Sequence, residues 1–124
     1  MNIKVLSDNC NRFEFWLLLN GDNIDFSKIE DILQIKIRSN SIVAPILCTE
    51  SSEYPVFYAE IAWLLDLVES KRNELINFGV CFAESQIWMI YYYEAQCNME
   101  FDSELLQRMG NLGLKLCVSC EQVD

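Results

Sequence analysis

The 124-residue chain contains no histidine, only four glycines and only two prolines. Histidine is the commonest general base and activator of nucleophiles, so the usual centre of acid–base catalysis is missing. Four glycines cannot build a phosphate cradle alongside ordinary turns, and GxGxxG, GxxxxGK[ST] and GxSxG are all absent. Carboxylate pairs are numerous, but no spacing identifies one of them as the pair of catalytic acids that a hydrolase would use. We therefore expect a protein that is not an enzyme.

The chain also lacks a long hydrophobic run and a secretory signal. Charges such as Glu14, Glu60 and Asp66 interrupt every apolar stretch before it reaches the roughly 20 residues of a membrane span. The N-terminus, MNIKVLSDNC, has neither a basic head nor an apolar h-region. These features predict a cytoplasmic protein. Its length, with 52% hydrophobic residues, predicts a single globular domain over residues 1–124.

Basic residues are scarce. The chain has nine lysines and arginines and nineteen acidic residues, which gives a net charge of −10. The residues from Ser51 onward contribute −8 of this charge. Such a surface repels nucleic acid and anionic membranes and attracts basic proteins. We therefore expect neither nucleic acid nor a membrane as a partner. Plain solubility explains many acidic proteins, and this alternative stays open.

The six cysteines, at positions 10, 48, 81, 97, 117 and 120, suit reduced and mostly buried thiols in a chain without a secretory signal. Cys117 and Cys120 have CxxC spacing, but they lie in an expected strand, where residues three apart point to opposite faces. Zinc would require two further ligands. We expect no metal and no cofactor, and a redox or metal role for Cys117 and Cys120 stays open.

The most regular stretch is Gln86–Ala95, QIWMIYYYEA. Alternation places Ile87, Met89, Tyr91 and Tyr93 on one face and Trp88, Ile90 and Tyr92 on the other. β-branched and aromatic residues favour a pleated surface. Apolar groups on both faces predict a central strand, or a strand whose outer face meets a partner.

Alternation predicts further strands, and apolar periodicity with capping residues predicts helices. The expected strands are 3–6, 13–19, 34–38, 41–48 and 114–120, and the expected helices are 25–33, 56–78 and 102–111. The stretches from Ile24 and Met99 repeat one order, in which a capped helix leads to a strand. We expect an α+β fold with two layers, a mainly antiparallel sheet with helices, ferredoxin-like split β-α-β character and an added central helix.

Two aromatic surfaces are candidate partner sites. On the long expected helix, Trp63 and Leu67 fall opposite the apolar stripe, with Glu60, Asp66 and Glu74 as an acidic rim. Buried tryptophans anchor interfaces, and surrounding charges set specificity. A covering loop or the N-terminal segment is the alternative explanation for this pair. The second candidate surface, if the sheet face is open, comprises Glu14, Trp16, Trp88, Tyr92 and Glu94.

The stretches FEFWLLLNGDNIDFSKIEDILQIKI and NMEFDSELLQRMGNLGLKLCVS resemble a family of small bacterial domains of unknown function. The matching positions are Gly21, Asp22, Ile29, Leu33 and Ile35 in the first block and Leu105, Leu112, Gly113, Leu114 and Leu116 in the second. Lys36 and Ile37 stand where that family tends to place a proline. These are core and turn positions, so the resemblance bears on fold more than on function.

The size, acidity and single-domain build are also similar to those of immunity proteins of bacterial toxin systems, including contact-dependent growth inhibition. This resemblance implies tight binding of a cognate toxin, often a basic nuclease domain, through an acidic and aromatic surface. The alternative is a regulatory or scaffolding domain, either monomeric or a weak homodimer through the same surface. A small-molecule binding domain is a third interpretation.

Overall fold

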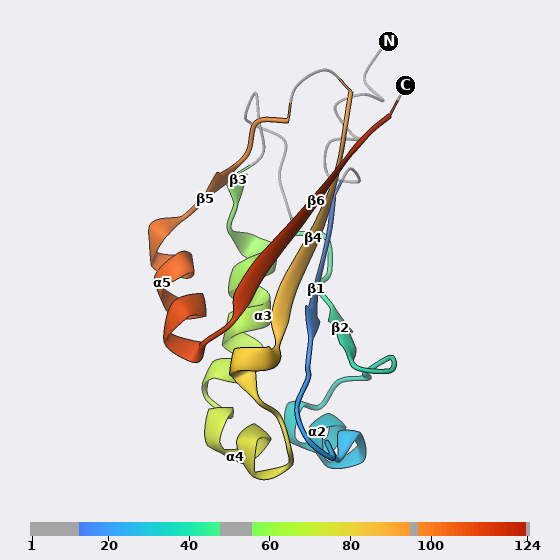
Figure 1. Ribbon diagram of the computed structural model, residues 1–124, viewed down its shortest axis with the longest axis vertical. Coiled ribbons are helices and arrows are strands. Elements are labelled where there is room, and N and C mark those ends of the chain that lie inside the picture. The colour runs from blue at the N-terminus through green and yellow to red at the C-terminus, as the bar shows by residue number, and fades with distance from the viewer. Residues whose placement is uncertain (1–12, 48–55, 95–96, 124) are drawn as a thin grey trace.

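The computed structural model describes residues 13–47, 56–94 and 97–123, and its main feature is a four-stranded sheet (Figure 1). The strands are β1 (Phe13–Leu18), β2 (Ser41–Val43), β4 (Gln86–Tyr93) and β6 (Lys115–Gln122), in the order β2-β1-β4-β6. β1 is antiparallel to β2 and β4, whereas β6 is parallel to β4. β4 lies between β1 and β6, so the prediction of a central strand is confirmed.

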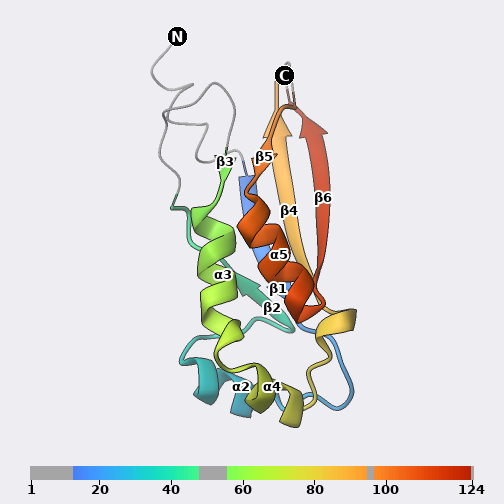
Figure 2. The same ribbon diagram turned by 90° about the vertical axis from the view of Figure 1, so that its left-hand side faces the viewer.

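Helices cover one face of this sheet. In Figure 2, α3 (Ala59–Glu69) and α5 (Ser103–Leu112) lie side by side in front of it, while α2 (Phe26–Leu33) and α4 (Arg72–Asn77) lie at one end. A parallel pair of short strands, β3 (Val56–Phe57) and β5 (Glu100–Phe101), precedes α3 and α5, and a 3-10 turn, η1 (Phe82–Glu84), precedes β4. The predicted two-layer α+β fold with a mainly antiparallel sheet is confirmed.

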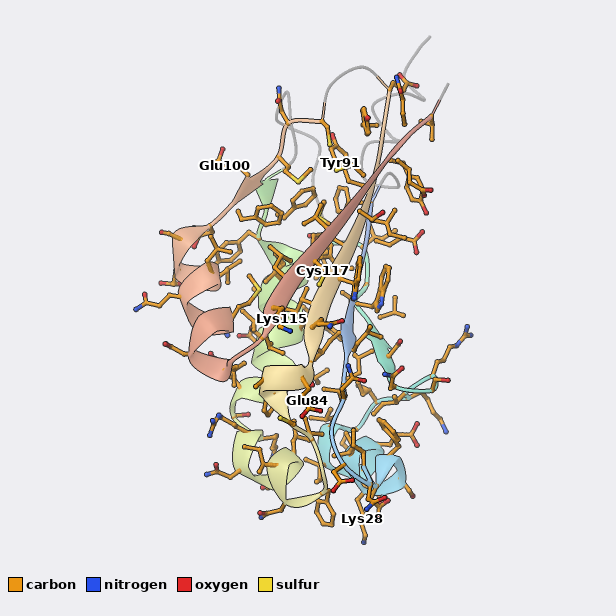
Figure 3. The ribbon with its side chains drawn as sticks, viewed as in Figure 1. Lys28, Glu84, Tyr91, Glu100, Lys115 and Cys117 are labelled. Atoms are coloured by element: carbon orange, nitrogen blue, oxygen red, sulfur yellow. The ribbon has the colours of Figure 1, made fainter. Side chains whose placement is uncertain are left out.

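The core fills the space between the sheet and the two covering helices (Figure 3). Alternation along β1 and β4 buries every second residue, and the helical repeat buries one stripe of α3 and of α5. The buried residues are Phe13, Phe15 and Leu17 of β1, Ile87 and Met89 of β4, Ile61, Leu64, Leu65 and Val68 of α3, and Leu105, Met109 and Leu112 of α5. The described elements therefore share one core.

Both predicted aspartate N-caps are present. The Asp25 carboxylate accepts a hydrogen bond from the backbone N–H of Lys28 at 3.2 Å. The Asp102 carboxylate accepts from the N–H groups of Glu104 at 2.9 Å and Leu105 at 3.3 Å. Each cap satisfies donors that the first turn of a helix leaves without a partner, so the chain enters α2 and α5 where the sequence predicts.

The expected helix over 56–78 is wrong in its extent. Residues 56–57 form β3, and the helical part is divided into α3 and α4 at Ser70 and Lys71. Lys71 leaves the helical region with φ −109° and ψ 14°. The turn redirects the chain so that Leu75 of α4 is fully buried. Gly79 follows the end of α4, as predicted. Its φ of 106° lies in the left-handed region, which glycine adopts with little steric cost.

The first expected β-α-β unit also differs. Strands β1 and β2 are antiparallel neighbours, and α2 lies at the sheet end instead of crossing a face (Figure 1). Gln34 ends α2 in a left-handed conformation, and 34–38 forms no strand beyond a single bridge from Arg38 to Ser41. Among the described elements, β4-α5-β6 has the parallel β-α-β form. The ferredoxin-like split is therefore not formed, and the expected strand at 3–6 lies outside the described residues.

Gly21 touches the loop after α4, and this contact leads to a testable prediction. A Cβ atom at Gly21 would lie 1.9 Å from the Gly79 carbonyl oxygen and 2.9 Å from the Cys81 nitrogen. Backbone must move to relieve such a contact, so we expect Gly21→Ala to lower the free energy of unfolding by about 1–3 kcal/mol in urea denaturation.

Gly110 is the matched control for this change. It lies inside α5, and a Cβ atom there would meet nothing within 4 Å. We expect Gly110→Ala to raise stability by about 0.5–1 kcal/mol, because alanine loses less backbone entropy in a helix. Equal stability of the two variants would contradict the close approach at Gly21.

Candidate protein-binding face of the sheet

The sheet face opposite α3 and α5 is the candidate site, and we call it the outer face. Strand register places thirteen side chains of known burial on it: Glu14, Trp16, Leu18, Ser41, Val43, Gln86, Trp88, Ile90, Tyr92, Lys115, Cys117, Ser119 and Glu121. Among the described residues, no helix lies over this face in either view (Figure 1, Figure 2). Within the described ranges the outer face therefore presents apolar and aromatic groups that no helix covers, which is typical of a binding surface.

Two tryptophans form the centre of the outer face. Trp16 of β1 and Trp88 of β4 are direct cross-strand partners. Their rings are nearly parallel, with centroids 6.3 Å apart and an interplanar angle of 11°. The Trp88 indole N–H donates to the Gln86 side-chain oxygen at 2.9 Å, which fixes that ring. Both tryptophans are half-buried, and the pair forms a platform with offset stacking.

Apolar neighbours extend this platform toward the sheet edge. Val43 of β2 is the direct partner of Trp16, and its side chain is 61% exposed. Leu18 and Ile90 are half-buried on the same face. Alternation placed Ile90 on the same face as Trp88, and the strand pairing shows that Leu18 lies on that face too.

One end of the outer face is acidic. Glu14 is exposed, and the Tyr92 hydroxyl donates to its Oε2 at 3.3 Å. Partial burial, the Glu14 charge and this hydrogen bond raise the pKa of Tyr92, with a smaller effect from Glu121. The phenol therefore stays a neutral donor at neutral pH. Glu121 is the cross-strand partner of Tyr92, and the exposed Glu94 lies just beyond β4.

The aromatic anchor expected on the helix, Trp63 with Leu67, stays a prediction, because both side chains keep some exposed surface. Trp63 and Leu67 are partly buried and pack against the core. Glu60 is 3% exposed, and its Oε2 accepts a hydrogen bond from the Leu47 backbone N–H at 2.7 Å. The segment after β2 therefore contacts the start of α3, so Glu60 satisfies a backbone donor and is not part of an exposed rim.

The remaining acidic residues of that surface have different surroundings. Arg108 of α5 binds Asp66 at 2.6 Å and Glu69 at 2.8 Å. These two carboxylates raise the pKa of Arg108, and the contacts tie α5 to α3. Glu74 is exposed on α4. The helix surface thus holds two exposed carboxylates of the predicted set, Asp66 and Glu74, and Arg108 binds the first of them.

Other chemistry finds little support in the described part of the chain. No group of three His, Cys, Asp or Glu side chains there could hold a metal ion. No described helix combines the length and apolarity required to cross a membrane. A pocket of about 420 Å³ lies beside β1 and β2, with Phe13, Phe15, Pro45 and Glu60 among its lining residues. Its buried carboxylate already binds Leu47, which leaves a mainly apolar wall.

Comparison with known proteins finds no match, whether to a family model, to a curated protein or to a solved structure.

Proposed function

We propose that this chain is an immunity protein that binds a basic bacterial toxin domain, such as a nuclease, through the outer face. The observation that carries the proposal is the stacked Trp16–Trp88 pair on a sheet face that no described helix covers, with the carboxylates of Glu14 and Glu121 toward one end of that face. Rigid aromatic residues lose little conformational entropy on binding and are frequent hot spots.

The charge distribution supports a basic partner. The chain has a net charge of −10, and Glu14, Glu94 and Glu121 lie at the Tyr92 end of the outer face. Carboxylates in this position attract a cationic active site that normally receives phosphates. Long-range attraction accelerates encounter, while the desolvated tryptophans slow dissociation. The proposed site of action is the cytoplasm, where a nuclease meets its substrate.

Co-expression with the product of the adjacent upstream reading frame tests the proposal. We expect a one-to-one complex with a basic domain that is toxic when expressed alone and inactive in the complex. Harmless expression of that neighbour together with failure to form a complex would overturn the immunity function.

Charge reversal gives a second test of the site. We expect Glu14→Lys with Glu121→Lys to lower the association rate constant for this toxin at least tenfold at low salt, because both changes oppose steering. Glu74→Lys on α4, which changes the net charge by half as much, is the control and should leave the rate near that of the unmodified protein. Stopped-flow measurements between low and high salt check this. A larger effect from Glu74→Lys would place binding on the helix layer.

A regulatory or scaffolding homodimer is the second candidate, and strand β6 favours it. Among the described strands of the main sheet, β6 has one neighbour, β4, and therefore forms an edge of that sheet. β6 is eight residues long, and its Val118 is 40% exposed. Antiparallel pairing of two copies about Val118 would set Lys115 opposite Glu121 of the second copy, joining opposite charges. Analytical ultracentrifugation separates the two functions, because the immunity proposal predicts a monomer in the absence of toxin.

A further inference from the structure

Two cysteines that are distant in the sequence meet beside β6. The Sγ atoms of Cys97 and Cys120 are 2.9 Å apart. Cys97 precedes β5 and packs partly buried against the core, whereas Cys120 lies on β6 and is exposed. Cys117, the CxxC neighbour of Cys120, is the partner of Trp88 and belongs to the outer face. The CxxC spacing suggested Cys117 and Cys120 as a pair, but the strand points them to opposite faces. The fold instead brings Cys97 and Cys120 together.

We propose that Cys97 and Cys120 are a redox site that closes to an intramolecular disulfide when the protein meets a low-molecular-weight disulfide such as oxidised glutathione. The pair lies on the α3 and α5 side of the sheet, since Cys120 is aligned with the inward-facing Tyr91. The site is thus separate from the tryptophan platform, and its chemistry does not depend on the proposed partner.

The positions of the two thiols assign their roles. Cys120 is exposed, so its thiolate can reach an external disulfide, attack one sulfur and release the first glutathione thiolate. Cys97 then loses its proton to water, and its thiolate attacks the Cys120 sulfur of the mixed disulfide. The second glutathione leaves. In total, two protein thiols become one disulfide, and the glutathione disulfide accepts two electrons and two protons to become two thiols.

The surroundings of Cys97 make it the second thiol to react. Burial and the hydrogen bond that its S–H donates to the Cys120 sulfur raise the pKa of Cys97 to about 11. A thiol of this pKa is protonated at neutral pH and attacks slowly from solution. Once Cys120 carries a glutathione, the reaction is intramolecular, and proximity offsets the small thiolate fraction. Closure should therefore accelerate as the pH rises from 7 to 9.

Closure would fasten the segment before β5 to the far end of β6. The linked stretch contains β5 and all of α5. A cross-link around a loop of this length restricts the unfolded chain. We expect oxidation to raise the melting temperature by roughly 5–15 °C for a domain of this size.

The test uses the full chain with Cys10, Cys48, Cys81 and Cys117 replaced by serine, so that only the pair remains. After incubation with glutathione buffers and alkylation, mass spectrometry should show a monomer that has lost two hydrogens and takes up no alkylating agent. Its melting temperature should rise. The same chain with Cys97→Ser should instead keep a glutathione on Cys120 and show no such rise.

Two results would overturn the proposal: a persistent glutathione adduct on Cys120 in the variant that retains Cys97, or a disulfide between two chains. If the fourfold serine variant does not fold, the unmodified protein is oxidised and its disulfides are mapped by fragmentation of the linked peptides. A Cys97–Cys120 link there supports the site, and a Cys117–Cys120 link contradicts it.

Discussion

Replacing Trp16 and Trp88 together with alanine is expected to weaken binding of the cognate toxin by roughly 10²–10³-fold. Each tryptophan is half-buried at the centre of the outer face and can contribute about 2 kcal/mol or more as a hot spot, while about 1.4 kcal/mol corresponds to a tenfold change. The two contributions overlap because the rings contact each other. Titration calorimetry with the purified toxin domain measures the effect.

The control is an exposed aromatic residue on the helix side. Tyr58 is 44% exposed directly before α3, so Tyr58→Ala removes a comparable ring from a different surface. We expect its affinity to equal that of the unmodified protein. Far-UV circular dichroism should show that the double variant retains its sheet. An unchanged affinity in the double variant, with a large loss in Trp63→Ala, would assign binding to the helix layer.

Replacing Phe57 with alanine is expected to lower the free energy of unfolding by about 3–5 kcal/mol. Its ring is fully buried and lies between Phe13, at 4.8 Å between centroids, and Phe101, at 5.5 Å. Alanine would leave a cavity where the sheet, β5 and the start of α3 meet. A loss of this size is a large share of the stability of a small domain, and urea unfolding at equilibrium measures it.

Phe57→Leu separates cavity formation from loss of an aromatic ring. Leucine fills most of the volume, so we expect a smaller loss of stability than with alanine. Phe101→Ala should also cost less, because Phe101 is only partly buried. If Phe57→Ala unfolds at nearly the same urea concentration as the unmodified protein, Phe57 is not the centre of this core.

Local chemistry explains why several elements could be predicted from the sequence. Asp25 and Asp102 cap helices through bonds to residues two or three positions away, so the signal is contained in a short window. The alternation of Phe13–Leu18 and Gln86–Tyr93 likewise indicates which side chains face the core. These features fix the type of each element without reference to the rest of the chain.

The remaining features depend on contacts between distant residues. Phe57 fits an apolar helical stripe, but pairing of β3 with β5 makes its backbone extended. Glu60 is charged and suggests exposure, yet its bond to the Leu47 N–H stabilises it in a buried position. Trp63 and Leu67 lie off the main stripe but still pack against the core. A helical wheel shows only the residues of one helix, so it cannot predict contacts with residues elsewhere in the chain.

The pairing of β1 with β4 has a consequence for synthesis of the chain on the ribosome. Leu18 pairs with Gln86, about 70 residues later. At typical bacterial and eukaryotic elongation rates, β1 waits roughly 3–14 s for its partner. During that interval β2 can pair with β1, but Phe13, Phe15 and Leu17 form an apolar stripe that β4 does not yet flank, and Glu14 on the opposite face is the only charge in β1. The nascent chain is therefore most prone to aggregate before β4 emerges, and charge at position 14 serves as a gatekeeper as well as a surface group.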